Sequence, residues 1–444
     1  MNDWQDAEDR VEKAQELFAQ QKWQEALDEL RAAIAMNPYN SSWYFNIGLT
    51  LDELGRFEEA LDAYTKGLRI EPDDIEALHR LGIDQARLGR FDQALKTFDQ
   101  ITRLDSSYEP AYCERIAVYA AMGNHEKAEE TFYIARQYKE ECPRCYFNVA
   151  HSLLERRLFD KAIYCWQRTL DLDESYPSVH VHLAQALALQ GELEKARQHY
   201  LQELRLDPGN TDALLDLGDL LLEMGRVDEA GEKFRRAIEL APAEPVTHVR
   251  YGRWLLICGR LEVARESISR ALHLDAHCPG AHMYLAEACL REGDLEQALH
   301  HLRVELRLDP RDPIILLDLA NLLMDCGEPR PAAACLKRLT TLEPDNASAW
   351  QNLAVAQFMI KHFEQGMASC HQALRCDPNA TTAMYNLALA YQRQGDHEKA
   401  LTWTRRAMQV DPRDSAIQRL ELRIRIMRFF SNLAAGIRKI LFLR

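Results

Sequence analysis

The chain has 444 residues, of which 47% are hydrophobic, and a formal net charge of −15 at pH 7. This length exceeds the usual size of one compact core, so the chain is either several domains or a repeat. Residues 413 to 444 hold eight Lys or Arg and two acids, a local balance of +6 that leaves −21 on the rest. An acidic body of this kind excludes nucleic-acid binding, which needs clustered Lys and Arg.

The N-terminal stretch and the cysteines indicate a compartment. MNDWQDAEDR is acidic and lacks the basic start and apolar core of a secretory signal, and no apolar stretch reaches the length of a membrane span. Eleven cysteines scattered over a long chain suit reduced thiols better than a disulfide framework. We therefore expect a cytoplasmic protein.

A period of 34 residues runs along the chain without insertion. No Ser-, Gly- or Pro-rich run resembles a linker between domains, which also favours a repeat. Prolines recur at multiples of this interval at Pro38, Pro72, Pro208, Pro242, Pro310, Pro344, Pro378 and Pro412. A small residue marks every one of twelve repeats at Ala26, Ala60, Ala94, Ala128, Ala162, Ala196, Ala230, Ala264, Ala298, Ala332, Gly366 and Ala400.

A second position is also small in every repeat except the fourth, where it is Ile116. Small residues at two places let two antiparallel helices approach closely, so each repeat is predicted to be a helical hairpin. Glycines such as Gly55, Gly89 and Gly225 mark the turn inside the hairpin, where a left-handed backbone is needed. The proline marks the end of the second helix. We predict an all-α solenoid over residues 1 to 414, with the twelve repeats starting at residue 7, followed by a C-terminal helix over 415 to 444.

One repeat carries a complete family signature. Its residues are Leu217, Gly218, Leu221, Gly225, Ala230, Phe234, Ala237 and Pro242. They resemble the tetratricopeptide repeat, and the resemblance extends over residues 7 to 414. It implies a right-handed superhelix whose first helices line a concave groove that holds other proteins. The array is similar to the long arm of O-linked N-acetylglucosamine transferases, but no catalytic domain follows here.

Some repeats depart from the pattern. Arg10 and Lys13 replace apolar residues in the first repeat, which suits an end repeat that meets water. Repeats four and five lose several signals, since Glu140 replaces a proline, Ile116 a small residue and Arg157 a glycine. We expect a locally altered twist there.

Asparagines recur at one repeat position that the resemblance places in the groove. Because Asn offers both a donor and an acceptor, a row of them can pair with the backbone of an extended peptide. The alternative is an ordinary solvated face. The members are Asn46, Asn148, Asn352 and Asn386. The pairing of Lys and Asn that forms a chaperone-binding carboxylate clamp in some family members is not reproduced.

The sequence CPRC, from Cys142 to Cys145, has the spacing of half a zinc site or of a redox pair. A tetrahedral site needs two more ligands, and no second pair of matching spacing follows. Cys113, His151 and Cys165 are the nearest candidates. We expect two ordinary thiols in an inter-repeat turn, and no metal or cofactor. The similar group of His277, Cys278 and His282 has the same interpretation.

An acidic stripe lies on one face of the predicted helix TDALLDLGDLLLE, within about 60° of arc at roughly 100° per residue. The stripe consists of Asp212, Asp216, Asp219 and Glu223. The equivalent face of the next repeat offers Arg250 and Arg253. A mixed-charge surface can select partners of complementary charge, and the alternative is a solvated face whose ion pairs contribute little.

A block of three repeats is copied. The sequence from Leu183 recurs 102 residues later from Leu285 and keeps Glu203 and Glu305 where half of the repeats have Ala. The second copy rebuilds the stripe in reduced form as Asp318, Asn321 and Asp325.

The C-terminal segment is basic and amphipathic. Its first part can cap the last hairpin with Ile417, Leu420 and Ile424. Further on, apolar residues lie beside two cations, and a helix of this kind can cap the solenoid, contact an anionic membrane or contact an acidic protein face. The residues for such a contact are Ile437, Arg438, Lys439 and Leu441.

No catalytic motif stands out. We therefore expect a non-catalytic scaffold that binds proteins or extended peptides and not nucleic acid. The alternative is a membrane-peripheral assembly factor attached through the C-terminal helix. The sequence does not reveal the partner or the oligomeric state.

Overall fold

The computed structural model describes residues 2 to 441, and side chains from residue 5 to residue 430. This part of the chain is built from helices and contains no strand, which confirms the predicted fold class. It divides into two compact units, Met1–Met224 and Gly225–Arg444. The sequence analysis expected one solenoid over residues 1 to 414, whereas the structure forms two compact units.

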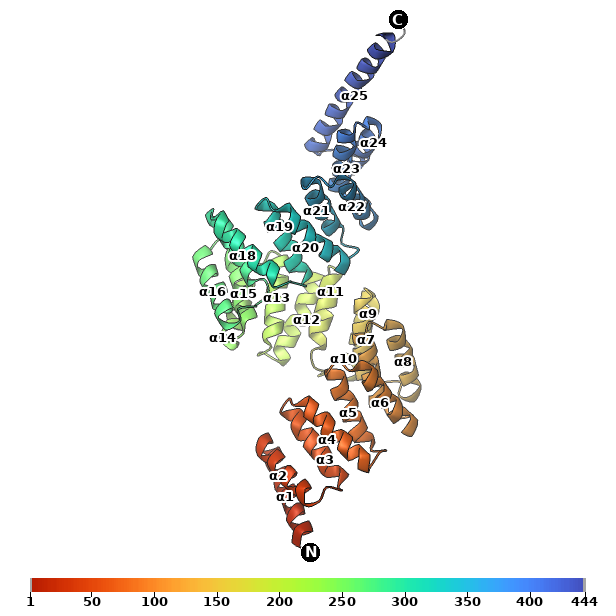
Figure 1. Ribbon diagram of the computed structural model, residues 1–444, viewed down its shortest axis with the longest axis vertical. Helices are drawn as coiled ribbons and strands as arrows, with labels where there is room; N and C mark the ends of the chain where they lie inside the picture. The colour runs from red at the N-terminus through yellow and green to blue at the C-terminus, as the bar shows by residue number, and fades with distance from the viewer. Residues whose placement is uncertain (1, 442–444) are drawn as a thin grey trace. The chain divides into compact units, whose positions relative to one another are not determined.

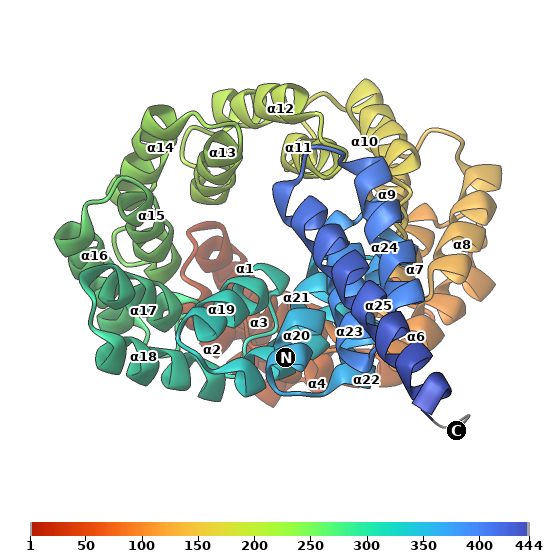
Figure 2. The same ribbon diagram turned by 90° about the horizontal axis from the view of Figure 1, so that it is seen from above.

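The first unit consists of consecutive helices, with each even-numbered helix up to α12 packed against the preceding odd-numbered one. In Figure 2, α9 and α11 lie on the inner side of this unit's curve, and α8, α10 and α12 lie on its outer side. The bounds are α1 Asn2–Ala19, α2 Trp23–Met36, α3 Ser41–Glu53, α4 Phe57–Ile70, α5 Ile75–Arg87, α6 Phe91–Leu104, α7 Glu109–Ala121, α8 His125–Tyr138, α9 Pro143–Glu155, α10 Phe159–Leu172, α11 Val179–Leu189, α12 Leu193–Leu206 and α13 Thr211–Glu223.

The second unit continues with the same kind of hairpin (Figure 1). In Figure 2, α15 and α17 lie on the inner side of the curve that α14 to α18 form. The bounds are α14 Val227–Leu240, α15 Pro245–Ile257, α16 Leu261–Leu274, α17 Ala281–Glu292, α18 Leu295–Arg307, α19 Pro313–Asp325, α20 Pro329–Leu342, α21 Ala347–Met359, α22 Phe363–Cys376, α23 Thr381–Gln394, α24 His397–Val410 and α25 Ser415–Leu441.

The turn inside each hairpin has the left-handed backbone that the glycines predict. All twelve equivalent residues have positive φ, between 57° and 84°. Nine are glycines, and the other three are Gln21, Arg157 and Lys361. The turn geometry is therefore kept where the glycine is lost, at the cost of placing a side chain in a disfavoured backbone region.

Close helix contact explains the second small position. A Cβ built on Gly82 of α5 would lie 2.5 Å from Cε1 of Phe98 on α6, because the ring packs directly on the glycine. The ring is fully buried. The small residue thus makes room for an apolar side chain of the second helix.

Five first helices begin at an asparagine or aspartate that accepts a hydrogen bond from the backbone N–H three residues later. Examples are Asn40, Asp74, Asn210 and Asn346. In α9 this N-cap position is occupied by Cys142, whose sulfur accepts from the N–H of Cys145 at 3.1 Å. A thiol is an unusual helix cap.

The copied block has its own way of starting a helix. α11 and α17 begin after Ser178 and Gly280, which have φ of 62° and 76°. The carboxylate of Glu305, fully buried on α18, accepts from the N–H groups of Gly280 at 2.8 Å and Met283 at 3.2 Å. This contact explains why a glutamate replaces the usual alanine of the repeat.

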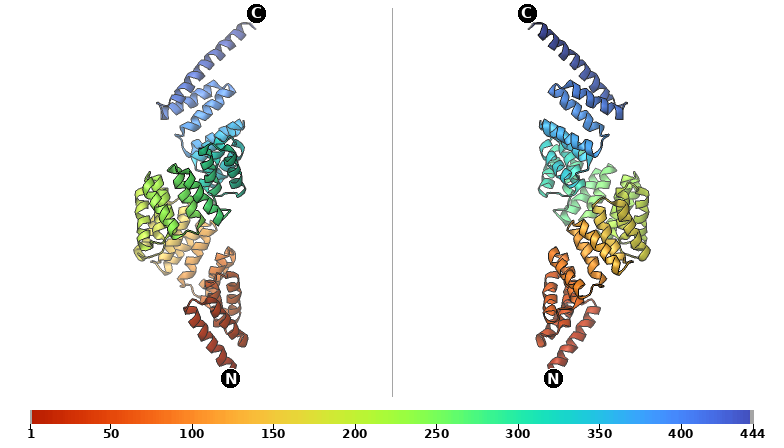
Figure 3. Two further views of the ribbon diagram at one scale, coloured as in Figure 1. Left: turned by 90° about the vertical axis from the view of Figure 1, so that its left-hand side faces the viewer. Right: turned by 90° about the vertical axis from the view of Figure 1, so that its right-hand side faces the viewer.

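The C-terminal helix packs on the last hairpin through its first half. Ile417, Leu420 and Ile424 are buried against α23 and α24. Figures 1 and 3 show α25 continuing past α24. None of the helices in the described range is both long enough and apolar enough to cross a membrane.

Candidate partner-binding site

Polar side chains of three first helices in the second unit lie along one row. Asn352 of α21 donates from Nδ2 to Oδ1 of Asn321 on α19 at 3.1 Å. Asn386 follows on α23. The structure therefore joins Asn321, which the sequence analysis placed in the copied stripe, to Asn352, one of the four predicted groove asparagines.

A cavity of about 410 Å³ adjoins this row between α21, α22 and α23. Asn386 lines it, and its Nδ2 atom is buried without a hydrogen-bond partner among the described residues. A buried amide donor without a partner is costly, so a ligand acceptor would be favourable there. The other lining residues are Val355, Phe358, Met359, Lys361, Phe363, Leu389, Ala390 and Arg393.

The cavity wall is mostly apolar, and its polar part is basic. The rings of Phe358 and Phe363 lie with centroids 6.3 Å apart, and the Arg393 guanidinium lies 5.9 Å from the Phe363 centroid. Such a wall suits an apolar side chain beside a carboxylate. The sequence analysis missed these two aromatic residues because Phe358 lies near the end of one helix and Phe363 begins the next.

The acidic stripe of α13 belongs to the first unit. Asp212 and Glu223 are exposed, whereas Asp216 and Asp219 are half-buried. Asp216 accepts at Oδ2 from Nε2 of Gln185 on α11 at 3.2 Å. The stripe is thus partly engaged with a neighbouring helix and is not a fully solvated face.

Arg250 and Arg253 lie on α15 of the second unit and are half-buried. Burial raises the pKa of Asp318 on α19, Glu287 raises it further, and the Arg253 guanidinium acts in the opposite direction. Arg253, Glu287 and Asp318 therefore form a mixed-charge surface on α15, α17 and α19. Asp325, the last member of the copied stripe, is exposed.

The two remaining asparagines lie in the first unit. Asn46 of α3 is half-buried. Asn148 of α9 donates from Nδ2 to the carbonyl oxygen of Cys113 on α7 at 2.7 Å. One of its two donors is thus used to link two first helices.

The cysteines of CPRC have closer neighbours than the sequence suggested. The sulfur of Cys113 lies 3.5 Å from that of Cys142 and 3.0 Å from that of Cys145. The hydrogen bonds from Cys113 and Cys145 lower the pKa of the Cys142 thiol. Glu109 of α7, which the sequence analysis did not consider, joins this group.

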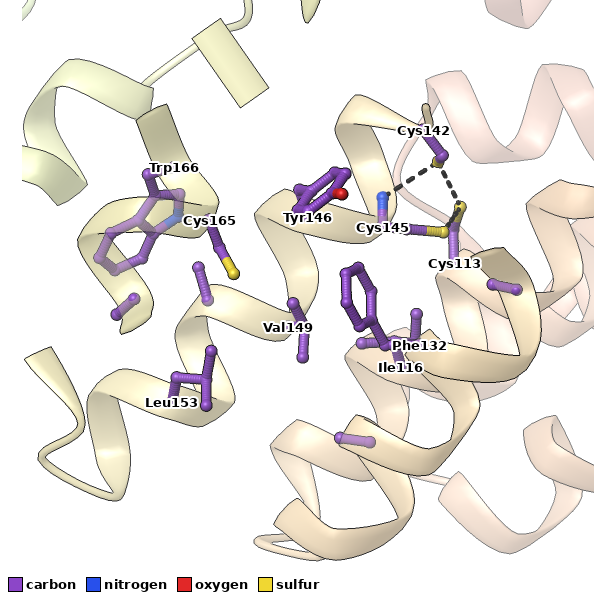
Figure 4. Close-up of a cluster of buried hydrophobic side chains, with 14 of the residues drawn as sticks. Cys113, Ile116, Phe132, Cys142, Cys145, Tyr146, Val149, Leu153, Cys165 and Trp166 are labelled. Carbon is purple, nitrogen blue, oxygen red and sulfur yellow. Dashed lines mark hydrogen bonds between the residues drawn. The ribbon is translucent and has the colours of Figure 1, made fainter. Parts of the chain in front are cut away.

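The other proposed ligands do not join it. Cys165 of α10 lies apart from the three clustered sulfurs (Figure 4), and burial raises its pKa to about 11. His151 packs between the rings of Phe147, Trp166 and His182. In the similar group of His277, Cys278 and His282, His282 pairs with His301 through their Nδ1 atoms at 3.0 Å.

The predicted contact residues of the C-terminal tail are Ile437, Arg438, Lys439 and Leu441. They fall within α25, but their side chains lie outside the described residues. In the described part, Arg428 pairs with Glu398 of α24 at 2.6 Å and Arg425 pairs with Glu421 at 2.7 Å.

No curated protein matches the sequence. Among solved structures, the chain is similar to Cut9 in the APC/C hetero-tetramer Cut9-Hcn1, with 15% identity, 93% and 95% of the two chains covered and a TM-score of 0.45. The chain is also similar to yeast Tom70, with 16% identity, 97% of this chain and 99% of the Tom70 chain covered, and a TM-score of 0.45. A third similar structure is a tetratricopeptide repeat protein from Parabacteroides merdae, with 18% identity, 56% of this chain and 99% of that chain covered, and a TM-score of 0.49.

Family models described as tetratricopeptide repeat match most of the chain. One matches residues 11–75, 79–142, 148–211 and 259–313. A second matches residues 198–248 and 290–358, and a third matches residues 381–414.

Proposed function

Because the chain belongs to the tetratricopeptide repeat family, we propose that it is a non-catalytic scaffold that binds an extended segment of a partner protein. The segment lies along the first helices of the second unit, over α19, α21 and α23. Proteins of this family generally hold other proteins together, and in this chain α19, α21 and α23 would supply the surface that does so.

The observation that carries the proposal is the unpaired amide of Asn386 at the wall of an apolar cavity. A peptide backbone carbonyl would satisfy this donor, and an apolar side chain of the peptide would fill the space between Phe358 and Leu389. Lys361 and Arg393 favour a carboxylate on the peptide next to that side chain.

A displayed library of random peptides, selected on the full chain, tests the proposal. We expect the selected peptides to share an apolar residue beside Asp or Glu. Asn386→Ala should weaken their binding about tenfold, since a buried hydrogen bond contributes roughly 0.5 to 1.5 kcal/mol and 1.4 kcal/mol is a factor of ten. Phe358→Ala should weaken it at least as much, as measured by fluorescence anisotropy.

Asn379→Ala is the matched control, because Asn379 is exposed in the turn before α23 and does not line the cavity. Its affinity should equal that of the unchanged chain. Selection of no common peptide, or equal affinity for all three variants, would contradict a binding site at α21 to α23.

A further inference from the structure

Four potential metal ligands converge between the fourth and fifth hairpins. Glu109 and Cys113 are four residues apart and lie on one face of α7, and Cys142 and Cys145 begin α9. One ligand atom from each residue lies within 4.8 Å of every other. Figure 4 shows the three cysteines pointing toward one another from the two helices. Among the described residues, no other group of three or more such side chains meets this condition.

The distances fit a single ion. Two sulfurs bound to one zinc ion at about 2.3 Å can be at most about 4.6 Å apart, and Cys113 lies 3.0 and 3.5 Å from the other two. Sulfur atoms in a disulfide are about 2.05 Å apart, and the three cysteines are free thiols. Each of the three is at most 2% exposed, so the sulfurs are closed to bulk solvent.

The carboxylate is oriented toward the sulfurs by an outer contact. Oε1 of Glu109 lies 3.6 Å from Sγ of Cys113, and Oε2 accepts from Nζ of Lys139 at 2.6 Å. Metal-binding carboxylates commonly have a second partner of this kind. Lys139 and the N-terminus of α9 also supply positive charge next to a group that would carry three thiolates and a carboxylate.

The repeat pattern shows that two of these cysteines replace residues better suited to the fold. The residue equivalent to Cys142 is Asn or Asp in repeats that cap the first helix, as at Asp74 and Asn210. The residue equivalent to Cys145 is Ala at several repeats, including Ala77 and Ala213. Replacing a good cap by a thiol has a physical reason if the sulfur binds an ion.

We propose that Glu109, Cys113, Cys142 and Cys145 bind one structural zinc ion that links α7 to α9. Three thiolates and a carboxylate form a tetrahedral set for a borderline-soft divalent cation. With four protein ligands the ion has no open position for a substrate, so its role is to stabilise the junction of two hairpins. The site lies in the repeats that lose several family signals, and the ion compensates for them.

The test uses the full chain, purified under reducing conditions without chelator, and measures bound zinc by elemental mass spectrometry. We expect one zinc ion per chain. After exchange with Co²⁺, we expect the thiolate-to-metal charge-transfer absorption and the visible bands of a tetrahedral site. Glu109→Gln should weaken zinc binding at least tenfold, measured by competition with a chromogenic chelator. Tenfold is the lower end of the loss of metal affinity that follows when a residue supporting a metal site is replaced.

The double variant Cys142→Asn with Cys145→Ala separates metal binding from folding, because it restores the residues that other repeats carry. It should fold, as judged by circular dichroism, and should bind no stoichiometric zinc. Cys370→Ala is the control, since Cys370 is a buried thiol of the second unit outside this group, and it should keep one zinc ion. Chelation should lower the melting temperature of the control and not that of the double variant.

Three results would overturn the proposal. The first is a reduced full chain that holds no zinc and gives no tetrahedral Co²⁺ spectrum. The second is a folded double variant that keeps the full zinc content. The third is a disulfide between two of the three cysteines, found by alkylation and mass spectrometry in protein that was kept under reducing conditions throughout purification.

Discussion

Single residues set how closely the two helices of a hairpin approach. Gly82 lies under the ring of Phe98, and a methyl group at that position would overlap the ring. Ala replaces Gly at the equivalent position of other repeats, as at Ala150 and Ala286. The tolerated size therefore depends on which side chain the second helix places there.

We expect Gly82→Ala to destabilise the chain by about 1 to 3 kcal/mol, the usual cost of overpacking a core. Urea unfolding followed by circular dichroism would measure this change. Adding Phe98→Leu should recover part of it, because Leu302 and Leu336 occupy the equivalent position in other repeats. Equal losses for the single and the double variant would show that ring overlap is not the cause.

His151 gives the stability a dependence on pH. Burial among aromatic rings, with a smaller contribution from His182, lowers the pKa of His151 to about 4 from its ordinary value near 6.5. The folded chain therefore takes up this proton less readily than the unfolded chain. The resulting stability is complete above pH 6.5 and is lost as the pH falls towards 4, by about 3 kcal/mol in total.

Replacing His151 by Leu, the residue at the equivalent Leu49 and Leu389, should remove this contribution. Unfolding midpoints in urea at several pH values between 7 and about 4 would show a shallower decline for His151→Leu than for the unchanged chain. Parallel curves would mean that His151 is not the group responsible.

Among single residues, the sequence predicted the positions of the small residues, but it did not predict the group around Glu109 or the cavity beside Asn386. Gly82 and Ala94 recur with the period, so one sequence reveals them. Glu109 carries no signal of its own, because its role depends on its contact with thiols about one repeat further along the chain. Cys113 and Cys145 are 32 residues apart and so occupy different positions of the 34-residue period, and the sequence analysis could name Cys113 only as a nearby candidate. The cavity beside Asn386 depends on the rotamers of the rings that form its wall and has no equivalent in the period.

Among the elements, the turn inside the hairpin is the most uniform. Its left-handed residue is Arg157 in the fifth hairpin, with φ of 57°. A side chain in this region costs roughly 1 to 2 kcal/mol relative to glycine. Arg157→Gly should therefore stabilise the chain by about 1 kcal/mol, after allowance for the greater freedom of glycine in the unfolded state.

Thermal unfolding by calorimetry would measure this gain. Gly123→Ala, at the equivalent residue of the preceding hairpin with φ of 69°, is the reciprocal variant and should lower the melting temperature. An Arg157→Gly chain that melts at or below the temperature of the unchanged chain would mean that the Arg157 side chain makes a compensating contact.

Element boundaries were predicted well where the period is regular. The second helices end two residues before Pro38 and Pro72, as expected. The late starts of α11 and α17 were not foreseen, because a turn with a left-handed residue at Ser178 precedes α11 and one at Gly280 precedes α17. Glu305 was recognised as unusual, but its role as the acceptor for α17 depends on a side chain that reaches back from α18.

For the whole molecule, the C-terminal helix distinguishes the scaffold from a membrane-attached assembly factor. A chain ending at Phe430 keeps Ile417, Leu420 and Ile424, which are buried on the last hairpin, and should remain folded. The scaffold predicts that neither this chain nor the full chain co-sediments with anionic liposomes. Binding by the full chain alone, weakened by salt, would instead support membrane attachment through residues 431 to 444.

The division of the chain into two compact units was not predicted. The 34-residue register continues unchanged through Met224 and Gly225, and Gly225 has the same left-handed backbone as the other turns. The sequence pattern predicts the local geometry, which is the same in every hairpin. It does not predict how the hairpins group into larger units.

The turn residues also offer a practical means of observing motion. A side chain added at a turn glycine such as Gly55 or Gly293 would meet no atom within 4 Å, and Gln21 and Arg157 already carry side chains there. Gln21 and Arg157 are therefore suitable attachment points for fluorescent dyes, because a side chain is already present there, and they are four repeats of 34 residues apart. Energy transfer between dyes at Gln21 and Arg157 would measure the distance between the first and the fifth hairpin of the first unit and would show whether this unit bends when a partner is bound.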